Sequence, residues 1–132
     1  MLKRLSLDEA ADAILSGGAI VFPTETSYGL GCLASNEAAV KLVIKAKGRP
    51  GGKPLPVLVP SADFLKSQNI ETPLLVLAEP FWPGPLTLVV PAFQGLAAPV
   101  TAHTNMVGVR MSAHPVAKAL VEQVGVPIVA TS

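Results

Sequence analysis

Five short apolar runs, each four to six residues long, recur along this chain of 132 residues. Runs of this length that are rich in aliphatic side chains and bounded by glycine or proline are typical of β-strands. They are AIVF (19–22), LPVLV (55–59), LTLVVP (86–91), VGVRM (107–111) and PIVATS (127–132). Segments with a helical pattern separate most of them, and this alternation predicts an α/β fold around one twisted sheet.

The helical segments carry start and stop signals. Ser6 and Glu9 form a capping box at the start of the first helix. Asn36 caps a second helix, and Gly48 follows its end. A proline opens each of the other two helices at the first turn, where it needs no hydrogen-bond partner. The four segments are 6–18, 36–48, 72–81 and 114–125.

The composition excludes several classes of protein. Half of the residues are hydrophobic and only 14% are charged, yet no apolar run reaches the roughly 18 residues of a membrane span. The N-terminus has no signal-peptide pattern, and the one cysteine, Cys32, suits a reducing compartment. We therefore expect a cytoplasmic protein without a membrane partner, folded as a single domain over 1–132. Because the net charge is +1, any basic binding site must be local.

The stretch PTETSYGLG (23–31) concentrates polar groups in an otherwise apolar region. It directly follows the first predicted strand, where open α/β sheets usually bind their ligands. One interpretation is a binding loop. The other is a capped turn, in which Thr24 or Thr26 caps a short helix and Tyr28 packs its ring. Spacing alone leaves the two open, and the glycines fit neither a dinucleotide fingerprint nor a P-loop.

Two basic features are candidate anion sites. Lys47, Arg49 and Lys53 lie on a turn rich in glycine and proline; they could converge on one anion, or they could be solvated charges near a helix C-terminus. Arg110 lies within an apolar strand. A charge there is costly unless it is paired or lines a pocket, although it could also face water.

Two other stretches favour structural interpretations. FWPGPLT (81–87) holds the only tryptophan and reads as a packing corner. His114 precedes a proline that opens a helix, so it reads as a cap or a surface residue.

Taken together, the motifs PTETSYGLG, KGRPGGKPL, WPGPLT, VGVRMSAHP and PIVATS, in this order, resemble the YrdC-like family of threonylcarbamoyl-AMP synthases. The resemblance covers the chain from about residue 5 to residue 132. It implies a twisted, mixed open sheet flanked by helices, as in YrdC-like and DHBP-synthase-like proteins. It also implies an enzyme that joins L-threonine, bicarbonate and ATP into threonylcarbamoyl-adenylate.

The resemblance assigns roles to individual residues. Thr24, Thr26 and Tyr28 match the loop that lines the threonine and adenylate pocket, and Arg110 matches the arginine that holds the threonine carboxylate. Lys47 and Arg49 match the Lys-x-Arg pair on the nucleotide phosphates, which gives them the catalytic role. Pro54 and Leu55 continue that motif.

The end of the chain matches the start of the family's Ser-Ala-Asn motif, with Thr131 and Ser132 in the nucleotide site. The chain stops before the Ala-Asn that should follow, so the resemblance implies a domain that lacks its C-terminal portion. We expect that an incomplete nucleotide site could leave this chain inactive, even if the complete protein is an enzyme.

Three positions depart from the family pattern. Glu25 stands where many members have Asp, Leu58 where some have His, and Ser112 where Pro is frequent. A histidine contact to threonine therefore cannot be assumed.

The implied chemistry needs ATP with Mg²⁺ as a substrate complex and no tightly bound cofactor. The implied partners are L-threonine, bicarbonate, the proteins that pass the threonylcarbamoyl group on, and tRNA. Both reactants are anionic, so Lys47, Arg49 and the magnesium ion are the expected sources of neutralising charge.

Two alternatives remain open. The cluster Lys41, Lys45, Lys47, Arg49 and Lys53 could form a stripe that binds double-stranded RNA or tRNA without catalysis. The chain could also be a YrdC-like domain of a larger carbamoyl-transfer protein.

Overall fold

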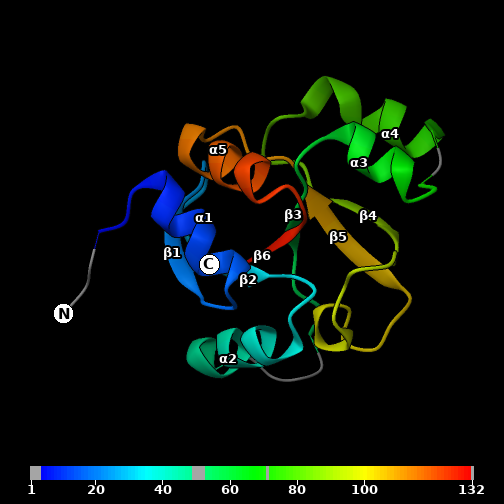
Figure 1. Cartoon of the computed structure of the whole chain (residues 1–132). Helices are drawn as coiled ribbons and strands as arrows, with labels where there is room; N and C mark the ends of the chain where they lie inside the picture. Colours follow the sequence, from blue (N-terminus) through cyan, green and yellow to red (C-terminus); the bar gives the residue numbers. More distant parts are fainter. Residues whose placement is uncertain (1–3, 49–52, 71, 132) are drawn as a thin grey trace.

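The computed structural model describes residues 4–48, 53–70 and 72–131 and folds them around one six-stranded sheet (Figure 1). The strand order is β1-β2-β6-β3-β5-β4, and only β3 and β5 run parallel. The strands are β1 (Ile20–Pro23), β2 (Tyr28–Leu33), β3 (Val57–Leu58), β4 (Leu88–Pro91), β5 (Met106–Arg110) and β6 (Ile128–Thr131). The prediction of an α/β fold with a mixed open sheet is confirmed.

The helices form where the caps predict them. The capping box of Ser6 and Glu9 is made, and Asn36 accepts a hydrogen bond from the amide of Ala39. Gly48 and Gly125 end their helices in the left-handed conformation. The helices are α1 (Leu7–Leu15), α2 (Glu37–Lys47), α3 (Ala62–Ser67), α4 (Thr72–Ala78) and α5 (Pro115–Val124), with 3₁₀ turns η1 (Glu79–Phe81) and η2 (Ala98–Val100).

The structure differs from the sequence prediction at several elements. Strand β2 was not predicted, because glycine is a poor strand former and YGLG reads as a loop. Helix α3 was not predicted either, because six residues give too little periodicity to recognise. The predicted helix 72–81 changes to a 3₁₀ turn after Ala78. Ladder pairing of the 55–59 strand is limited to Val57 and Leu58.

The packing corner at 81–87 is confirmed. The indole N–H of Trp82 donates to the carbonyl of Leu86 at 2.9 Å, and the ring packs against the larger core cluster. The amide of Gly84 donates to the carbonyl of Met111 at 2.8 Å, which ties the corner to the residue that follows β5.

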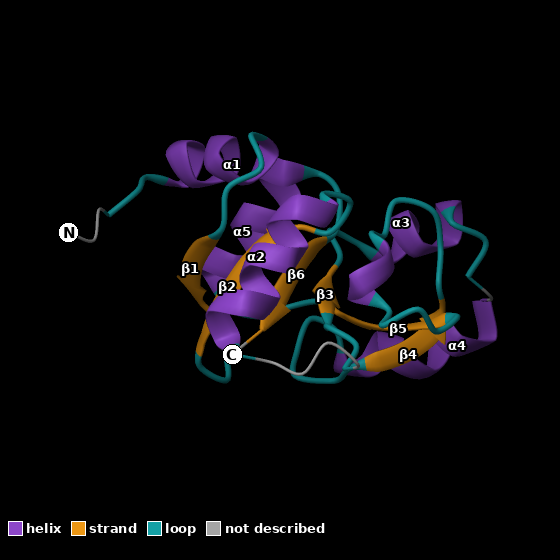
Figure 2. Cartoon of the chain, turned by 90° about the horizontal axis from the view of Figure 1, so that it is seen from below, coloured by secondary structure: helices purple, strands orange, loops and turns teal. Residues whose placement is uncertain are grey.

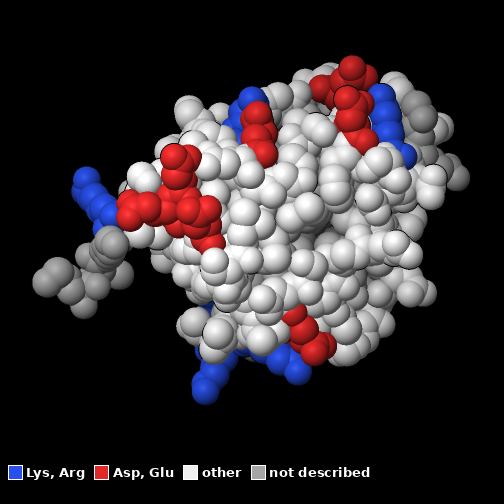
Figure 3. Space-filling view, in the orientation of Figure 1, with Lys and Arg blue, Asp and Glu red and all other residues white. Residues whose placement is uncertain are grey.

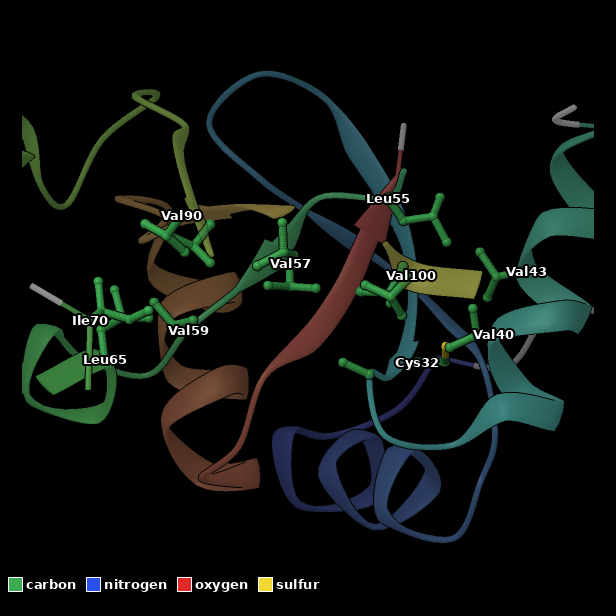
Figure 4. Close-up of a cluster of buried hydrophobic side chains, with 14 of the residues drawn as sticks. Cys32, Val40, Val43, Leu55, Val57, Val59, Leu65, Ile70, Val90 and Val100 are labelled. Carbon is green, nitrogen blue, oxygen red and sulfur yellow. The ribbon is translucent and has the colours of Figure 1, made fainter. Parts of the chain in front are cut away.

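Each face of the sheet covers its own hydrophobic core. Helices α1 and α5 pack on one face, where Leu58, Ile128 and Ala130 are buried. The other face packs against α2, α3 and α4 and contains Val57 and Val129 (Figures 1 and 4). Alternate residues of β3 and β6 therefore point to opposite cores, as the strand pleat requires. Figure 2 shows α3 and α4 beside the β3–β5–β4 half of the sheet.

The single cysteine belongs to the larger core. Cys32 is fully buried on β2, and burial raises the pKa of its thiol to about 11. The thiol therefore stays protonated at neutral pH and behaves as a small apolar group.

Glycine is required at one position of β2, where the Val129 carbonyl and the Phe22 ring both come close to the backbone. A Cβ on Gly31 would come within 2.2 Å of the carbonyl oxygen of Val129 and 2.7 Å of the Phe22 ring. A Cβ on Gly29 would meet its neighbours at ordinary distances, 3.7 Å or more. The two glycines of the GLG stretch therefore have different roles, and close approach of the backbone requires only Gly31.

We predict that Gly31→Ala lowers the free energy of unfolding by about 1–3 kcal/mol, because the added methyl group overpacks the sheet. Gly29→Ala is the matched control, and we expect it to stay within about 1 kcal/mol of the unsubstituted protein or to stabilise it slightly. Urea unfolding of both variants checks this. Equal effects of the two substitutions would contradict it.

Candidate functional site

The turn between β1 and β2 is built by the hydroxyl of Thr24. This hydroxyl donates to the carbonyl of Ser27 at 2.7 Å, accepts from the Ser27 amide at 3.3 Å and lies 3.2 Å from the Thr26 hydroxyl. The amide of Thr24 also donates to the Ser27 carbonyl at 2.7 Å. The turn therefore belongs to a β-hairpin, and Thr24 and Thr26 do not cap a helix.

Tyr28 does not pack its ring into the core. Its side chain is 70% exposed at the first position of β2, opposite Pro23 of β1. An aromatic ring this exposed beside a polar turn is available to a ligand. The interpretation of this stretch as a turn held by its own hydroxyl groups fits Thr24 and Thr26. The exposed ring of Tyr28 instead fits the interpretation as a binding loop.

Glu25, at the tip of the turn, joins the hairpin to the N-terminus of α5. Its Oε2 accepts hydrogen bonds from the hydroxyl of Ser112, from the amide of Ala113 at 3.0 Å and from the amide of His114 at 3.3 Å. His114 is the N-cap of α5, where its Nδ1 accepts from the amide of Val116 at 3.1 Å, which confirms its predicted capping role. One carboxylate thus fixes two distant segments together.

The other oxygen of Glu25 faces Arg110. Oε1 lies 3.6 Å from the Arg110 Nε, and the two side chains are only 17% and 18% exposed. Arg110 ends β5 in register with Leu58, whose side chain belongs to the core under α1 and α5. Of the readings that the sequence leaves open, the structure therefore gives Arg110 an ion-pair partner and does not leave it simply facing water.

The Glu25 carboxyl is ionised at neutral pH. Burial on its own would raise its pKa, but the Ser112 hydroxyl, a hydrogen bond to its own backbone, the charge of Arg110 and the His114 amide bring the pKa below the ordinary value of 4.5. Within the described part of the chain, Oε1 is a buried oxygen without a hydrogen-bond partner. Arg110 therefore neutralises it by charge at 3.6 Å, a distance too long for a hydrogen bond.

A second group of the predicted residues lies on the other face of the sheet. Thr131 pairs with Leu30 of β2 and is 2% exposed, and its neighbour Ala130 donates to the carbonyl of Pro56 at 3.1 Å. Leu55 is fully buried in the larger core, beside the end of β6 in Figure 4, and its amide donates to the carbonyl of Val100 at 2.8 Å. Leu55 can therefore shape a pocket wall but offers a ligand neither a side-chain contact nor a free amide.

The remaining predicted residues lie at or beyond the ends of the described segments. Lys47 is exposed in the last turn of α2, and Pro54 is exposed just ahead of β3. Arg49 and Ser132 lie outside the described residues. The structure thus brings Arg110 together with the 24–27 turn, and it places Thr131 and Leu55 near one another on the opposite face.

Sequence reasoning missed Glu25 and Ser112 as partners. The sequence identifies both only as departures from the family pattern, whereas in the structure they form a hydrogen bond with each other across 87 positions of sequence. The available signal was that Glu25 is the single carboxylate in a stretch otherwise rich in hydroxyl groups. The third departure, Leu58, is a core residue with 1% exposure.

Charged side chains gather at the periphery of the face seen in Figure 3, and its centre is uncharged. Basic groups lie along the edge formed by α2, where Lys41 is paired with Glu37 at 3.9 Å. Among the described residues, no three His, Cys, Asp or Glu side chains are grouped to hold a metal ion. No helix in the same residues is long and apolar enough to cross a membrane.

The model of the Sua5/yciO/yrdC family, described as "Telomere recombination", matches residues 12–132. The chain belongs to this family. A threonylcarbamoyl-AMP synthase of Pyrococcus abyssi is 43% identical over 125 residues, which are 93% of this chain and 37% of that relative. One from Xylella fastidiosa is 36% identical over 137 residues, covering all of this chain and 73% of the relative.

Solved structures agree with this assignment. The chain matches P. abyssi Sua5 complexed with L-threonine with a TM-score of 0.87 and 40% identity, covering 98% of this chain and 40% of that one. Full-length HypF in a phosphate- and nucleotide-bound form matches with a TM-score of 0.82 and 21% identity, covering 98% of this chain and 20% of that one. The second match shows a shared fold alone. The chain spans about two fifths of the length of the P. abyssi relative.

We predict that Glu25→Gln lowers the free energy of unfolding at pH 7 by on the order of 1–3 kcal/mol, because it removes the charge from three hydrogen bonds and an ion pair. The folded-state pKa of Glu25 is lowered, so its stabilisation is complete above the unfolded value of 4.5 and is lost as the pH falls through the folded-state pKa. The difference between variant and unsubstituted protein should therefore shrink as the pH falls below 4.5.

Urea unfolding at pH 7 and at several acidic pH values measures this difference. Glu122→Gln is the matched control, because Glu122 makes an exposed i,i+4 pair with Lys118 at 2.8 Å. We expect that control to change stability by less than about 0.5 kcal/mol. A Glu25→Gln deficit that is independent of pH would show that the charge of Glu25 is not what stabilises the fold.

Proposed function

We propose that this protein is an L-threonylcarbamoyladenylate synthase, which makes threonylcarbamoyl-AMP from L-threonine, bicarbonate and ATP. The observation that carries the proposal is a half-buried guanidinium, Arg110, held beside a hydroxyl-rich turn in a chain whose relatives are named threonylcarbamoyl-AMP synthase. A solved relative in complex with L-threonine supports threonine as the amino-acid substrate.

The proposed reaction joins two anions. The amine of threonine combines with bicarbonate to give an N-carboxylate, with loss of water. One oxygen of that carboxylate then attacks the α-phosphorus of ATP, and the bond to pyrophosphate breaks. Positioning and charge neutralisation dominate such a phosphoryl-centre displacement, so the reaction needs cations more than it needs a general base.

The residues divide into two roles. Arg110 binds the threonine carboxylate, and Thr24, Thr26 and Tyr28 line the pocket for threonine and adenylate. Lys47 and Arg49 contact the nucleotide phosphates and are the catalytic cations, with Mg²⁺ arriving as part of the MgATP substrate. Pro54, Leu55, Thr131 and Ser132 complete the nucleotide side; for Leu55 this means shape alone, since its side chain is buried and its amide is bonded.

The product is a reactive mixed anhydride, so another protein must accept the threonylcarbamoyl group. We propose partner proteins that transfer this group to tRNA, and a cytoplasmic location where tRNA and these partners meet. The nucleotidyltransferase class of the enzyme follows from the same reaction.

We predict that Lys47→Ala and Arg49→Ala each lower threonine-dependent pyrophosphate release at least tenfold, which is about 1.4 kcal/mol in the activation barrier. The assay contains the protein, MgATP, bicarbonate and L-threonine. Lys118→Ala is the matched control, because Lys118 is also an exposed helical lysine but is paired with Glu122 on α5. An unchanged rate in the Lys47 and Arg49 variants would remove these residues from the site.

The same preparation tests the RNA-binding alternative, which the basic edge along α2 favours. Binding to double-stranded RNA that weakens steeply with salt, without any threonine-dependent pyrophosphate release, would replace the enzyme by a binding module. RNA affinity that is indifferent to salt would count against that module.

A further inference from the structure

Arg110 is held from one side only. Its Nε faces the Oε1 of Glu25 at 3.6 Å, and this is the one polar interaction that its guanidinium makes with the described residues. A guanidinium is a planar group with five N–H donors, and it binds a carboxylate best through two parallel hydrogen bonds. Contact at the Nε side leaves the donors of the terminal amino groups available for a second anion.

Glu25 itself is firmly fixed. Its Oε2 accepts from one hydroxyl and two backbone amides, all of them contributed by residues 112–114. The backbone of Glu25 lies in a turn that Thr24 stabilises through its own hydroxyl. The carboxylate therefore has little freedom to move, and it can serve as a fixed support for the longer arginine side chain.

The buried state of Oε1 determines what kind of role Glu25 can have. This oxygen is closed off from solvent, so a ligand cannot reach it without displacing the turn. Glu25 therefore acts through Arg110 and does not touch the substrate.

We propose that Glu25 is a positioning residue, which holds Arg110 at its Nε side so that the terminal amino groups of the guanidinium face the α-carboxylate of the amino-acid substrate. This inference rests on the proposed function for the identity of that substrate. It assigns to the hairpin turn a second task besides lining the pocket, namely the orientation of a cation on a different strand.

Two opposing effects follow from neutralising Glu25. Loss of its negative charge would make the potential at Arg110 more positive and attract an incoming carboxylate. Loss of its support would leave a largely buried guanidinium, 18% exposed, without a partner, and an unpaired buried charge moves toward water or other acceptors. If Glu25 positions Arg110, the loss of support must outweigh the change in potential. Weaker binding of the substrate by Glu25→Gln is therefore the result that indicates positioning.

The binding experiment compares L-threonine with L-threoninol, which carries an alcohol in place of the carboxylate, by calorimetry on the 132-residue protein. Glu25→Gln should weaken threonine binding at least tenfold and change threoninol binding less than twofold. Glu25→Asp keeps the charge and should retain more threonine affinity than Glu25→Gln. Glu122→Gln, on the exposed side of α5, is the control and should leave both affinities unchanged.

A second readout follows Arg110 without any ligand. Because the Arg110 side chain is only 18% exposed and its Nε faces the Glu25 carboxylate, its Nε–H, identified by its disappearance in Arg110→Lys, should exchange slowly with water and give a signal in a ¹⁵N-correlated NMR spectrum. That signal should be lost or should exchange rapidly in Glu25→Gln. The native dispersion of the amide signals in the same spectrum shows whether the variant is folded.

The outcomes distinguish failure of this inference from failure of the proposed function. Threonine binding that is unchanged or tighter in Glu25→Gln, or an Nε–H signal that persists there, overturns the positioning role even if the enzyme activity is real. Equal weakening of threonine and threoninol also overturns it and leaves only a structural role. A protein that binds no threonine refutes the proposed substrate and this inference with it, whereas loss of the Nε–H signal would still assign the support of Arg110 to Glu25.

Discussion

Strand β6 lies in the middle of the sheet and joins its two halves, and the described residues form no other ladder between them. It pairs antiparallel with β2 on one side and with β3 on the other. In the part of the chain that the structure describes, the β1–β2 hairpin and the β3–β5–β4 group are therefore joined into one sheet by Ile128–Thr131 alone. Because Ile128 and Ala130 are buried on one face and Val129 on the other, three of the four residues of β6 also belong to the hydrophobic cores. This strand therefore brings the β1–β2 hairpin and the strand that carries Arg110 into one sheet.

Local patterns in the sequence were sufficient for most elements, because caps and apolar runs act over a few residues. The Asn36 cap, Gly48 and the proline that opens α5 predicted α2 and α5 to within one residue at each end, and the capping box at Ser6 predicted the start of α1, which ends at Leu15, before the predicted end at residue 18. Strand β2 could not be predicted from local propensity, since Gly31 is required by the close approach of the Val129 carbonyl and the Phe22 ring. That requirement exists only after β2 has paired with β6 and β1. Tertiary packing overrode the local preference at this point.

The candidate site was predicted less completely than the fold, and the reason is the distance in sequence between its parts. Arg110 was recognised as unusual because a charge in an apolar strand needs a partner or a pocket. The identity of that partner, Glu25 in a turn at the other end of the chain, follows from no local pattern. The alternation of side chains along the strands places Thr131 and Leu55 on the face of the sheet opposite Arg110, and no local pattern predicts this either. The resemblance to a family assigned these residues to one function, and the structure shows that the sheet itself separates them into two groups.

The Glu25–Arg110 pair also explains how the Arg110 guanidinium can remain partly buried when no ligand is bound. An unpaired guanidinium at this depth would be costly, and a fully hydrogen-bonded one would have no donors left to offer. The contact of the Arg110 Nε with Glu25 at 3.6 Å avoids both problems, because it neutralises the charge of the guanidinium without using its terminal amino groups. The hydrogen bonds that fix Glu25 come from residues 112–114, directly after β5. The segment that carries Arg110 is therefore followed directly by the residues that fix the Glu25 carboxylate. Glu25, in the β1–β2 turn, contacts both Arg110 and these residues.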